Sequence, residues 1–351
     1  MRHSMTRETA VGMKKACLLL ATILLAGPVG AGAQQYTVTN LGVLTGLTNS
    51  YGTAINERGE VTGYSQPPQG GAETAFLYRN GTLQTLGTPS ETDSVAYGIN
   101  DSGEVTGYLG DSAFLYSNGT IYLPQGRHSS IGYAINKGGQ ITGGFAPHGC
   151  CGQYQAFLFS NGTTQNIGTL GGAGSAGYGI NASGQVTGYS WITGSTQSHA
   201  FLYTNGSMQD LGTLGGAYSE GAAINASGQV TGGSATATDI YTHAFLYRNG
   251  TMQDLGTFPG GSTSYGYAIN ASGEVTGYSY TWDRAVHAFL YRNARMIDLN
   301  SRISSTDAQT YTLTSGRAIN DKGQIVVDAT VNATGVSAAL LLTPTTKNSA
   351  D

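Results

Sequence analysis

The chain has 351 residues, of which 54 are Gly, 22 are Tyr and 10% are charged. The glycines follow no Gly-X-Y period, which excludes a collagen-like fold. A hydrophobic content of 39% with few charges excludes a disordered chain. Few Lys and Glu residues accompany many Ser, Thr and Asn residues, a balance that disfavours long helices and predicts short strands joined by turns.

The N-terminus has the features of an export signal. Lys14 and Lys15 precede an apolar run over residues 16–26, and Ala31-Gly32-Ala33 forms a cleavage site. This run is too short to span a bilayer, and no other apolar run reaches 18 residues. We therefore expect a signal peptide over 1–33 and a chain exported to the periplasm or the extracellular space, without membrane insertion.

Charge limits the partners of the exported part. Without residues 1–33 the chain keeps 12 Lys and Arg and 19 Asp and Glu, a net charge of −7. Nucleic acids and anionic membrane surfaces are recognised by clustered Lys and Arg, so neither is expected as a partner. We expect a monomer.

One short pattern, a small residue followed by Ile and Asn, occurs seven times along the chain. A period near 40–45 residues made of short strands is typical of propeller blades. The steps between successive Asn residues are 44, 36, 45, 44, 45 and 50 residues. The seven Asn residues are Asn56, Asn100, Asn136, Asn181, Asn225, Asn270 and Asn320.

Each repeat is predicted to form four strands. In the fifth, strand one ends at a turn over Asn225 to Gly228, strand two follows, and a variable loop leads to strand three, His243 to Arg248. Asn249-Gly250 then makes a two-residue hairpin turn, because both of its central residues need positive φ. Strand four is Thr251 to Leu255. The sixth repeat has Asn293-Ala294 at this turn, which predicts a conformational cost there.

The two ends of the chain predict a closed ring. The seventh repeat has no fourth strand, whereas Tyr36 to Gly42 aligns with the fourth strand Thr251 to Gly256. Pairing the N-terminal strand with the last repeat would remove exposed sheet edges. The sequence therefore predicts an all-β fold, a seven-bladed β-propeller over residues 34–345 with a tail over 346–351. A β-solenoid is the alternative.

The repeats also carry a recognisable motif. His-Ala-Phe-Leu-Tyr occurs at His199, His243 and His287, followed in the fourth and fifth units by Asn-Gly-Thr/Ser-Met-Gln-Asp-Leu-Gly-Thr. The chain resembles the bacterial extracellular repeat family named for this His-Ala-Phe triplet, the HAF repeat. The resemblance implies export and a repeat architecture, and it carries over no site residue. The first three units have other residues in place of the His, namely Thr74, Ser112 and Gln155.

The repeated polar residues are expected to be structural. The three His residues fall in different blades, so we expect each to bond to a loop carbonyl, and we predict no metal site. A repeated Asp at the end of strand four is expected to accept hydrogen bonds from the next turn. We find no calcium loop, nucleophile elbow or phosphate loop, so no catalytic residue and no cofactor are predicted. The three Asp residues are Asp210, Asp254 and Asp298.

Cys150 and Cys151 are adjacent between two glycines. In an exported protein they could form a strained vicinal disulfide, because disulfides persist in oxidising compartments. Two free thiols in a loop remain the alternative.

Function is expected in the loops between strands two and three, which differ most among the repeats. Aromatic residues in polar loops suit stacking on sugar rings or anchoring of a protein. The sequence therefore predicts a secreted, non-enzymatic scaffold that binds a glycan, a surface polymer or a protein through one propeller face. The candidate ligand-binding residues are Trp191, Trp282, Tyr241, Tyr280, Tyr154, Asp283 and Arg284.

The alternative is a polysaccharide-active hydrolase or lyase with its site at the propeller axis. Such an enzyme needs two carboxylates, or a base with an Arg, near the axis. The predicted inner strands offer mainly Gly, Ala, Tyr and Ser, and Arg317 is the lone charge directly before an Ala-Ile-Asn segment. This composition disfavours the enzyme.

Overall fold

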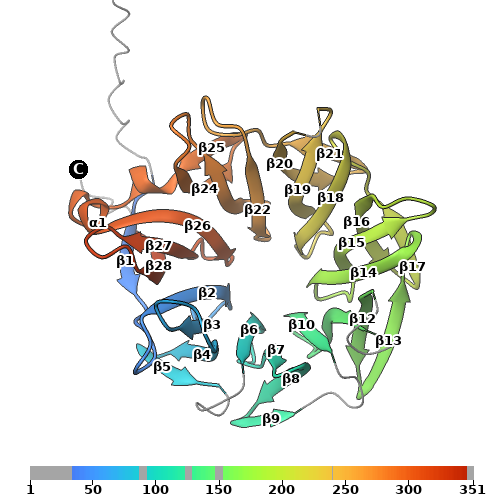
Figure 1. The fold of residues 1–351 in the computed structure, drawn as a ribbon, viewed down its shortest axis with the longest axis horizontal. Helices are drawn as coiled ribbons and strands as arrows, with labels where there is room; N and C mark the ends of the chain where they lie inside the picture. Colours follow the sequence, from blue (N-terminus) through green and yellow to red (C-terminus); the bar gives the residue numbers. More distant parts are fainter. Residues whose placement is uncertain (1–33, 87–92, 123–128, 147–152, 239, 346–351) are drawn as a thin grey trace, which may run out of the picture. The chain divides into compact units, whose positions relative to one another are not determined.

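The structure, a computed structural model, describes residues 34–86, 93–122, 129–146, 153–238 and 240–345. The predicted signal peptide, the predicted tail and Cys150 and Cys151 lie outside these residues. Within them, 28 strands form seven antiparallel sheets of four strands, arranged as blades around a central axis (Figure 1). The seven-bladed propeller is therefore confirmed, and the β-solenoid alternative is wrong.

The blades follow one another along the chain, and the first strand of each lies nearest the axis (Figure 1). The strands of blades one to four are β2 (Asn49–Ile55), β3 (Val61–Gln66), β4 (Thr74–Arg79), β5 (Thr82–Thr85); β6 (Ser94–Ile99), β7 (Val105–Leu109), β8 (Ser112–Ser117), β9 (Thr120–Tyr122); β10 (Ser130–Ile135), β11 (Ile141–Phe145), β12 (Gln155–Ser160), β13 (Thr163–Gly168); β14 (Gly171–Ile180), β15 (Val186–Ile192), β16 (Ser198–Thr204) and β17 (Ser207–Asp210). Those of blades five to seven are β18 (Gly215–Ile224), β19 (Val230–Thr236), β20 (Thr242–Arg248), β21 (Thr251–Asp254); β22 (Ser264–Ile269), β23 (Val275–Tyr280), β24 (Val286–Arg292), β25 (Arg295–Asp298); β26 (Tyr311–Ile319), β27 (Ile325–Val331), β28 (Ser337–Pro344) and β1 (Tyr36–Asn40).

Blade seven is completed by the N-terminal strand, as predicted. β1 pairs antiparallel with β28, from Tyr36 opposite Pro344 to Asn40 opposite Leu340. Between β25 and β26 lie the 3₁₀ helix η1 (Leu299–Arg302) and the helix α1 (Ser305–Thr310), which the repeat pattern did not predict. They account for the 50-residue step before the last repeat.

The turn between strands three and four has the expected geometry. Asn249 and Gly250 both have positive φ, 51° and 78°. Asn293 and Ala294 hold the same conformation, with φ of 51° and 57°. A left-handed backbone is unfavourable for alanine, so this conformation is the one for which the sequence predicted a cost.

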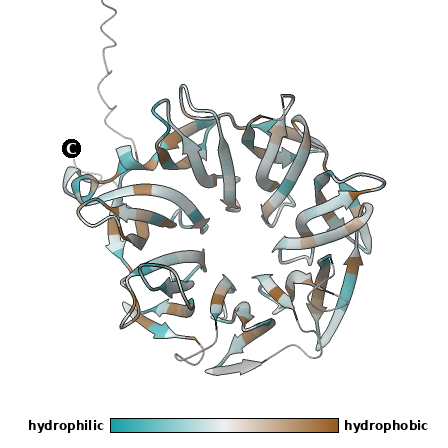
Figure 2. Cartoon of the chain, in the orientation of Figure 1, coloured by the Kyte–Doolittle hydropathy of each residue, from teal (hydrophilic) through white to brown (hydrophobic). Residues whose placement is uncertain are grey.

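Apolar side chains lie mainly where neighbouring blades meet. The Phe of strand three is fully buried, as at Phe245 and Phe289. One cluster joins Ala244 and Leu246 of blade five to Ile269 and Phe289 of blade six. Figure 2 shows such hydrophobic residues in every blade. Strand three is therefore covered on both faces.

The repeated Asn also links neighbouring blades. The Nδ2 of each Asn donates to the backbone carbonyl oxygen of the Asn in the next blade, at 3.0–3.5 Å. Its Oδ1 accepts from backbone N–H groups of its own turn, as Asn225 does from Ser227 and Gln229. These bonds form a complete circle of seven, which the sequence analysis did not predict.

Candidate functional site

The innermost strand of every blade contains a β-bulge at one repeated position. In blade three, Gly132 pairs with Gly143 and Ala134 pairs with Thr142, which leaves Tyr133 without a partner residue. A bulge locally bends the strand and re-aims the side chain of the extra residue. The equivalent residues in the seven blades all line one cavity at the axis. They are Thr53, Tyr97, Tyr133, Tyr178, Ala222, Tyr267 and Arg317.

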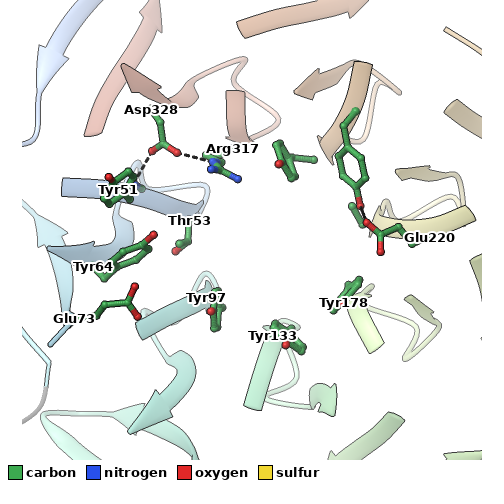
Figure 3. A pocket seen from close by; sticks show the side chains of 14 residues that line it. Tyr51, Thr53, Tyr64, Glu73, Tyr97, Tyr133, Tyr178, Glu220, Arg317 and Asp328 are labelled. Atoms are coloured by element: carbon green, nitrogen blue, oxygen red, sulfur yellow. Dashed lines mark hydrogen bonds and ion pairs between the residues drawn. The ribbon is translucent and has the colours of Figure 1, made fainter. Parts of the chain in front are cut away.

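This axial cavity has a volume of about 410 Å³, large enough for a small ligand or part of a chain. Figure 3 shows the side chains that surround it, which come from several blades. Four of the seven bulge residues are Tyr, so the lining is largely aromatic. The other side chains that define the chemistry of the cavity are Tyr51, Tyr64, Tyr265, Glu73, Glu220 and Asp328.

Three tyrosines from blades two to four form a continuous arc. The ring centroids of Tyr97 and Tyr133 are 5.2 Å apart, and those of Tyr133 and Tyr178 are 4.9 Å apart with the rings edge to face. Burial raises the pKa of all three phenols above its ordinary value. They are therefore neutral near pH 7, with apolar faces and hydroxyl groups that donate and accept hydrogen bonds.

Blade seven replaces a tyrosine pair by an ion pair. Arg317 and Asp328 stand where blade six has Tyr267 and Tyr278, and Arg317 Nε lies 2.5 Å from Asp328 Oδ2. The other oxygen of Asp328 accepts from the Gly52 N–H at 3.2 Å. Asp328 is only 5% exposed, and burial raises its pKa although Arg317 opposes this. The Arg317 guanidinium also lies 4.6 Å from the centroid of the Tyr267 ring.

Two further carboxylates reach the cavity, each held by a tyrosine of another strand. The Tyr265 hydroxyl donates to Glu220 Oε1 at 2.6 Å, and the Tyr108 hydroxyl donates to Glu73 Oε2 at 2.7 Å. Among the residues that the structure describes, neither Glu73 nor Glu220 takes part in an ion pair. The cavity therefore combines aromatic faces with two carboxylates that have no cationic partner in the described chain.

A second cavity of about 440 Å³ lies against blades five and six. It shares Glu220, Tyr265 and Tyr267 with the axial cavity, so the two spaces meet at these residues. Tyr218, which is 51% exposed, lines its outer part. The candidate site thus comprises two adjoining cavities.

The loop residues predicted from the sequence line neither cavity. Trp282 is 79% exposed, Tyr241 46% and Tyr154 38%, whereas Trp191 and Tyr280 are half-buried. Their role in binding stays a prediction.

The two charged candidates lie in the same loop as Trp282. Asp283 is exposed and bonds to the Thr281 hydroxyl and to the Ala285 N–H, and these bonds lower the pKa of its carboxyl. Arg284 is exposed and has a φ of 68°. The carboxylate of Asp283 thus accepts hydrogen bonds from residues of its own loop.

Sequence reasoning missed Glu73, Glu220 and Asp328 as axial residues. Glu73 lies at the end of the loop between β3 and β4, and Glu220 lies on the innermost strand β18 two residues before the bulge at Ala222. A signal was present for the bulge residues instead, because the residue before each small-Ile-Asn segment varies among Thr, Tyr, Ala and Arg while its neighbours repeat. That variation marks the cavity lining.

The three repeated His residues bind a different partner from the one expected. His243 Nδ1 lies 2.9 Å from Asp254 Oδ2, and the same contact joins the other two pairs at 2.7–2.8 Å, so the predicted bond to a loop carbonyl is wrong. The predicted role of the Asp is confirmed, because Asp254 also accepts from the Gly256 N–H at 2.7 Å. The other two pairs are His199–Asp210 and His287–Asp298.

The described part of the chain contains neither a metal-binding cluster nor a membrane-spanning helix. Its His, Cys, Asp and Glu residues form no group of three or more that could hold a metal ion. None of its helices is both long and apolar enough to cross a membrane.

The comparisons with known proteins show the fold. No protein-family profile and no curated protein matches the chain. The chain is similar to the extracellular domain of a protein described as a hybrid two-component system from B. thetaiotaomicron, with a TM-score of 0.55 and 11% identity. The match covers 89% of this chain, which spans about two fifths (40%) of that structure.

Two similar structures come from peptidases. The β-propeller domain of the Trilobed protease from Pyrococcus furiosus, described as having an open velcro topology, matches with a TM-score of 0.51 and 7% identity, over 86% of this chain and 100% of that one. An acylaminoacyl peptidase from Pyrococcus horikoshii matches with a TM-score of 0.50 and 9% identity, over 85% and 52%. The chain is thus a seven-bladed propeller whose fold is shared with an extracellular domain and with hydrolases.

Proposed function

We propose that this protein is an exported glycan-binding propeller, related to the HAF-repeat family, whose ligand enters the axial cavity. One observation carries the proposal. A single repeated bulge position places four tyrosines and one arginine around one cavity of about 410 Å³. Aromatic faces that also present hydroxyl groups suit sugar rings, because they stack on the apolar face of the ring and bond to its hydroxyls.

The arrangement of the blades supports binding at this place. The circle of Asn hydrogen bonds and the β1–β28 pairing make the ring a rigid frame. A site built on such strands is held in place more closely than one on loops, so little freedom is lost when a ligand binds. The exposed loop aromatic Trp282 would then supply at most a secondary contact.

A glycan array followed by titration calorimetry tests this proposal. The variant Tyr133→Ala should lose about tenfold or more in affinity, because stacking on one aromatic side chain contributes about 1–3 kcal/mol in comparable ring contacts. Tyr133→Phe keeps the ring and should lose less. Trp282→Ala is the matched control at the loops and should bind as the wild type does, with circular dichroism showing that each variant is folded.

Two results would overturn the axial site. Binding that survives Tyr133→Ala but is lost in Trp282→Ala would move the site to the variable loops, as the sequence alone predicted. A folded wild-type protein that binds no glycan would remove the proposed function altogether.

A polysaccharide-active hydrolase or lyase is the second candidate. Glu73 and Glu220 favour it, because two carboxylates in one aromatic cavity are the groups that glycoside hydrolysis requires. Release of reducing ends from a polysaccharide, abolished in both Glu73→Gln and Glu220→Gln, would replace the binding proposal by this one. Binding without turnover in the wild type would exclude the enzyme.

A further inference from the structure

The charge of the axial cavity is unbalanced. Arg317 is paired with Asp328 at 2.5 Å, so these two charges offset each other. Glu73 and Glu220 remain, each bonded to a tyrosine hydroxyl and neither paired with a cation in the described chain. A neutral sugar would leave this negative charge uncompensated, whereas a ligand with a positive group would neutralise it in a partly buried site.

Blade five differs from the other blades beside Glu220. The bulge residue is Ala222, where four blades have Tyr, and the equivalent of Tyr278 on strand two is Gly233. A Cβ added at Gly233 would lie 2.4 Å from the Tyr265 ring. The small residues therefore make room for Tyr265, whose hydroxyl holds Glu220, and for a ligand group on the cavity side of that carboxylate.

The surroundings of Glu220 are those of a cation site. Tyr265 and Tyr267 lie with ring centroids 4.8 Å apart, and both line the axial and the second cavity together with Glu220. Burial raises the pKa of both phenols above its ordinary value. The Arg317 guanidinium already lies 4.6 Å from the centroid of the Tyr267 ring, so the Tyr265 ring is the aromatic surface that remains for a cation beside Glu220. Aromatic faces attract an ammonium group electrostatically, and a carboxylate adds a charge-assisted hydrogen bond.

Glu220 also lies where the two cavities meet, since it is one of the three residues that line both. Because the two cavities share these lining residues, a ligand group at Glu220 lies next to both. The second cavity has a volume of about 440 Å³, similar to that of the first. This arrangement suits an inner unit of a linear oligosaccharide better than a single sugar.

We propose that the site binds an oligosaccharide of amino sugars with free amino groups, and that the protonated amine of an inner unit pairs with Glu220. This inference rests on the proposed glycan-binding function and specifies its ligand. The free amine supplies the positive charge, and the sugar rings supply the faces that the tyrosines contact. An acetylated amine would lose both the charge and part of the fit.

The test is calorimetry of the wild-type protein at pH 5.5 with three hexasaccharides: a glucosamine oligomer, its N-acetylated form and a glucose oligomer of the same linkage. The glucosamine oligomer should bind at least about tenfold more tightly than either of the others, because one charged hydrogen bond contributes about 1.5–3 kcal/mol. Raising the salt concentration should weaken this binding.

Glu220→Gln keeps the shape of the side chain and should remove this preference. Asp307→Asn on α1, outside both cavities, is the matched control, because it removes one negative charge and should retain the preference. The comparison of ligands on the wild type needs no variant, so the inference stays testable if Glu220→Gln does not fold.

The outcomes distinguish the inference about the amine from the proposed glycan-binding function. Equal affinity for the glucosamine and glucose oligomers would overturn the amine inference and leave glycan binding standing. A preference that persists in folded Glu220→Gln would also overturn it. Binding of none of the three overturns the inference, and the glycan array then decides the proposed function.

Discussion

Asn320 donates a hydrogen bond from Nδ2 to the backbone carbonyl oxygen of Asn56, 3.1 Å away in the next blade and 264 residues earlier in the chain. This bond closes the circle of seven Asn residues. The repeated Asn is therefore a link between blades as well as part of a turn. It holds the end of each innermost strand in register with the next.

Replacing one of the seven repeated Asn residues should lower the free energy of unfolding. Asn225 is 4% exposed, donates to Gln229 and to the Asn270 carbonyl, and accepts from two backbone N–H groups. Asn225→Ala should lower the free energy of unfolding by about 2–4 kcal/mol, because buried polar groups lose their partners. Urea denaturation measures this. Ser227→Ala in the same turn is the control and should change it by less than about 0.5 kcal/mol; equal effects would contradict the role given to Asn225.

The His–Asp pairs should contribute little individually. His243 and Asp254 lie at the surface, with side chains 22% and 43% exposed. A double-mutant cycle with His243→Ala and Asp254→Ala should give a coupling energy of about 0.2–1 kcal/mol, as for other exposed pairs. Asp254→Ala alone should cost more than His243→Ala, because Asp254 also accepts from Gly256. A coupling near zero, or strong stabilisation by added zinc, would contradict this structural role.

Alkaline pH should destabilise the propeller. Burial raises the pKa of the cavity tyrosines above 10, and burial with the nearby Glu274 raises the pKa of Tyr36 to about 12. The folded state therefore holds protons that the unfolded state releases above about pH 10. This stabilisation is complete below pH 10 and decreases as the pH rises towards the folded-state pKa values.

Urea midpoints between pH 8 and 11.5, with absorbance at 295 nm to follow phenolate, measure this effect. Tyr133→Phe removes one buried phenol and should make the decline less steep. If the urea midpoint of Tyr133→Phe falls with pH as steeply as that of the wild type, the axial tyrosines do not cause the loss of stability at alkaline pH.

Breaking the Arg317–Asp328 pair should destabilise the protein, and replacing both residues together should restore most of the lost stability. Arg317→Ala leaves the buried Asp328 carboxylate without its cation and should cost about 2 kcal/mol, less than a fully buried pair because Arg317 is 36% exposed. The double variant Arg317→Tyr/Asp328→Tyr installs the pair that blade six has at Tyr267 and Tyr278, and should recover most of the loss. A double variant no more stable than the single one would contradict the equivalence of these positions.

The sequence predicted the scaffold well because its determinants are local. Asn-Gly turns, the Ala-Ile-Asn spacing and the match of Tyr36 to Gly42 with strand four each depend on a few adjacent residues. The Asp partner of each repeated His could also have been predicted from the sequence. Units that have Thr74 or Gln155 in place of His have Thr85 or Asn166 in place of Asp, and this joint loss indicates a contact.

The candidate site was harder to predict because it depends on neighbouring blades. The alternation of side chains between the two faces of β18 does not show which residues face the axis, because the bulge at Ala222 shifts the register. Tyr265 of blade six contacts Glu220 of blade five. This contact requires a residue without a side chain at Gly233 of blade five, because a Cβ there would meet the Tyr265 ring. Such information lies in the assembled ring, where residues 45 positions apart along the chain meet.

The bulge has a consequence for how this protein can change. The residue at the repeated bulge has no partner in the ladder, and its side chain lines the cavity. Substitution there alters the ligand surface while the hairpin, the Asn circle and the interblade core keep their contacts. Some of the seven bulge residues contact one another, as Tyr97 does Tyr133 and as Arg317 does Tyr267, so these positions are partly coupled. New specificities are therefore accessible to evolution, or to a focused library, with little loss of stability at the bulge positions other than Arg317, which is paired with the buried Asp328.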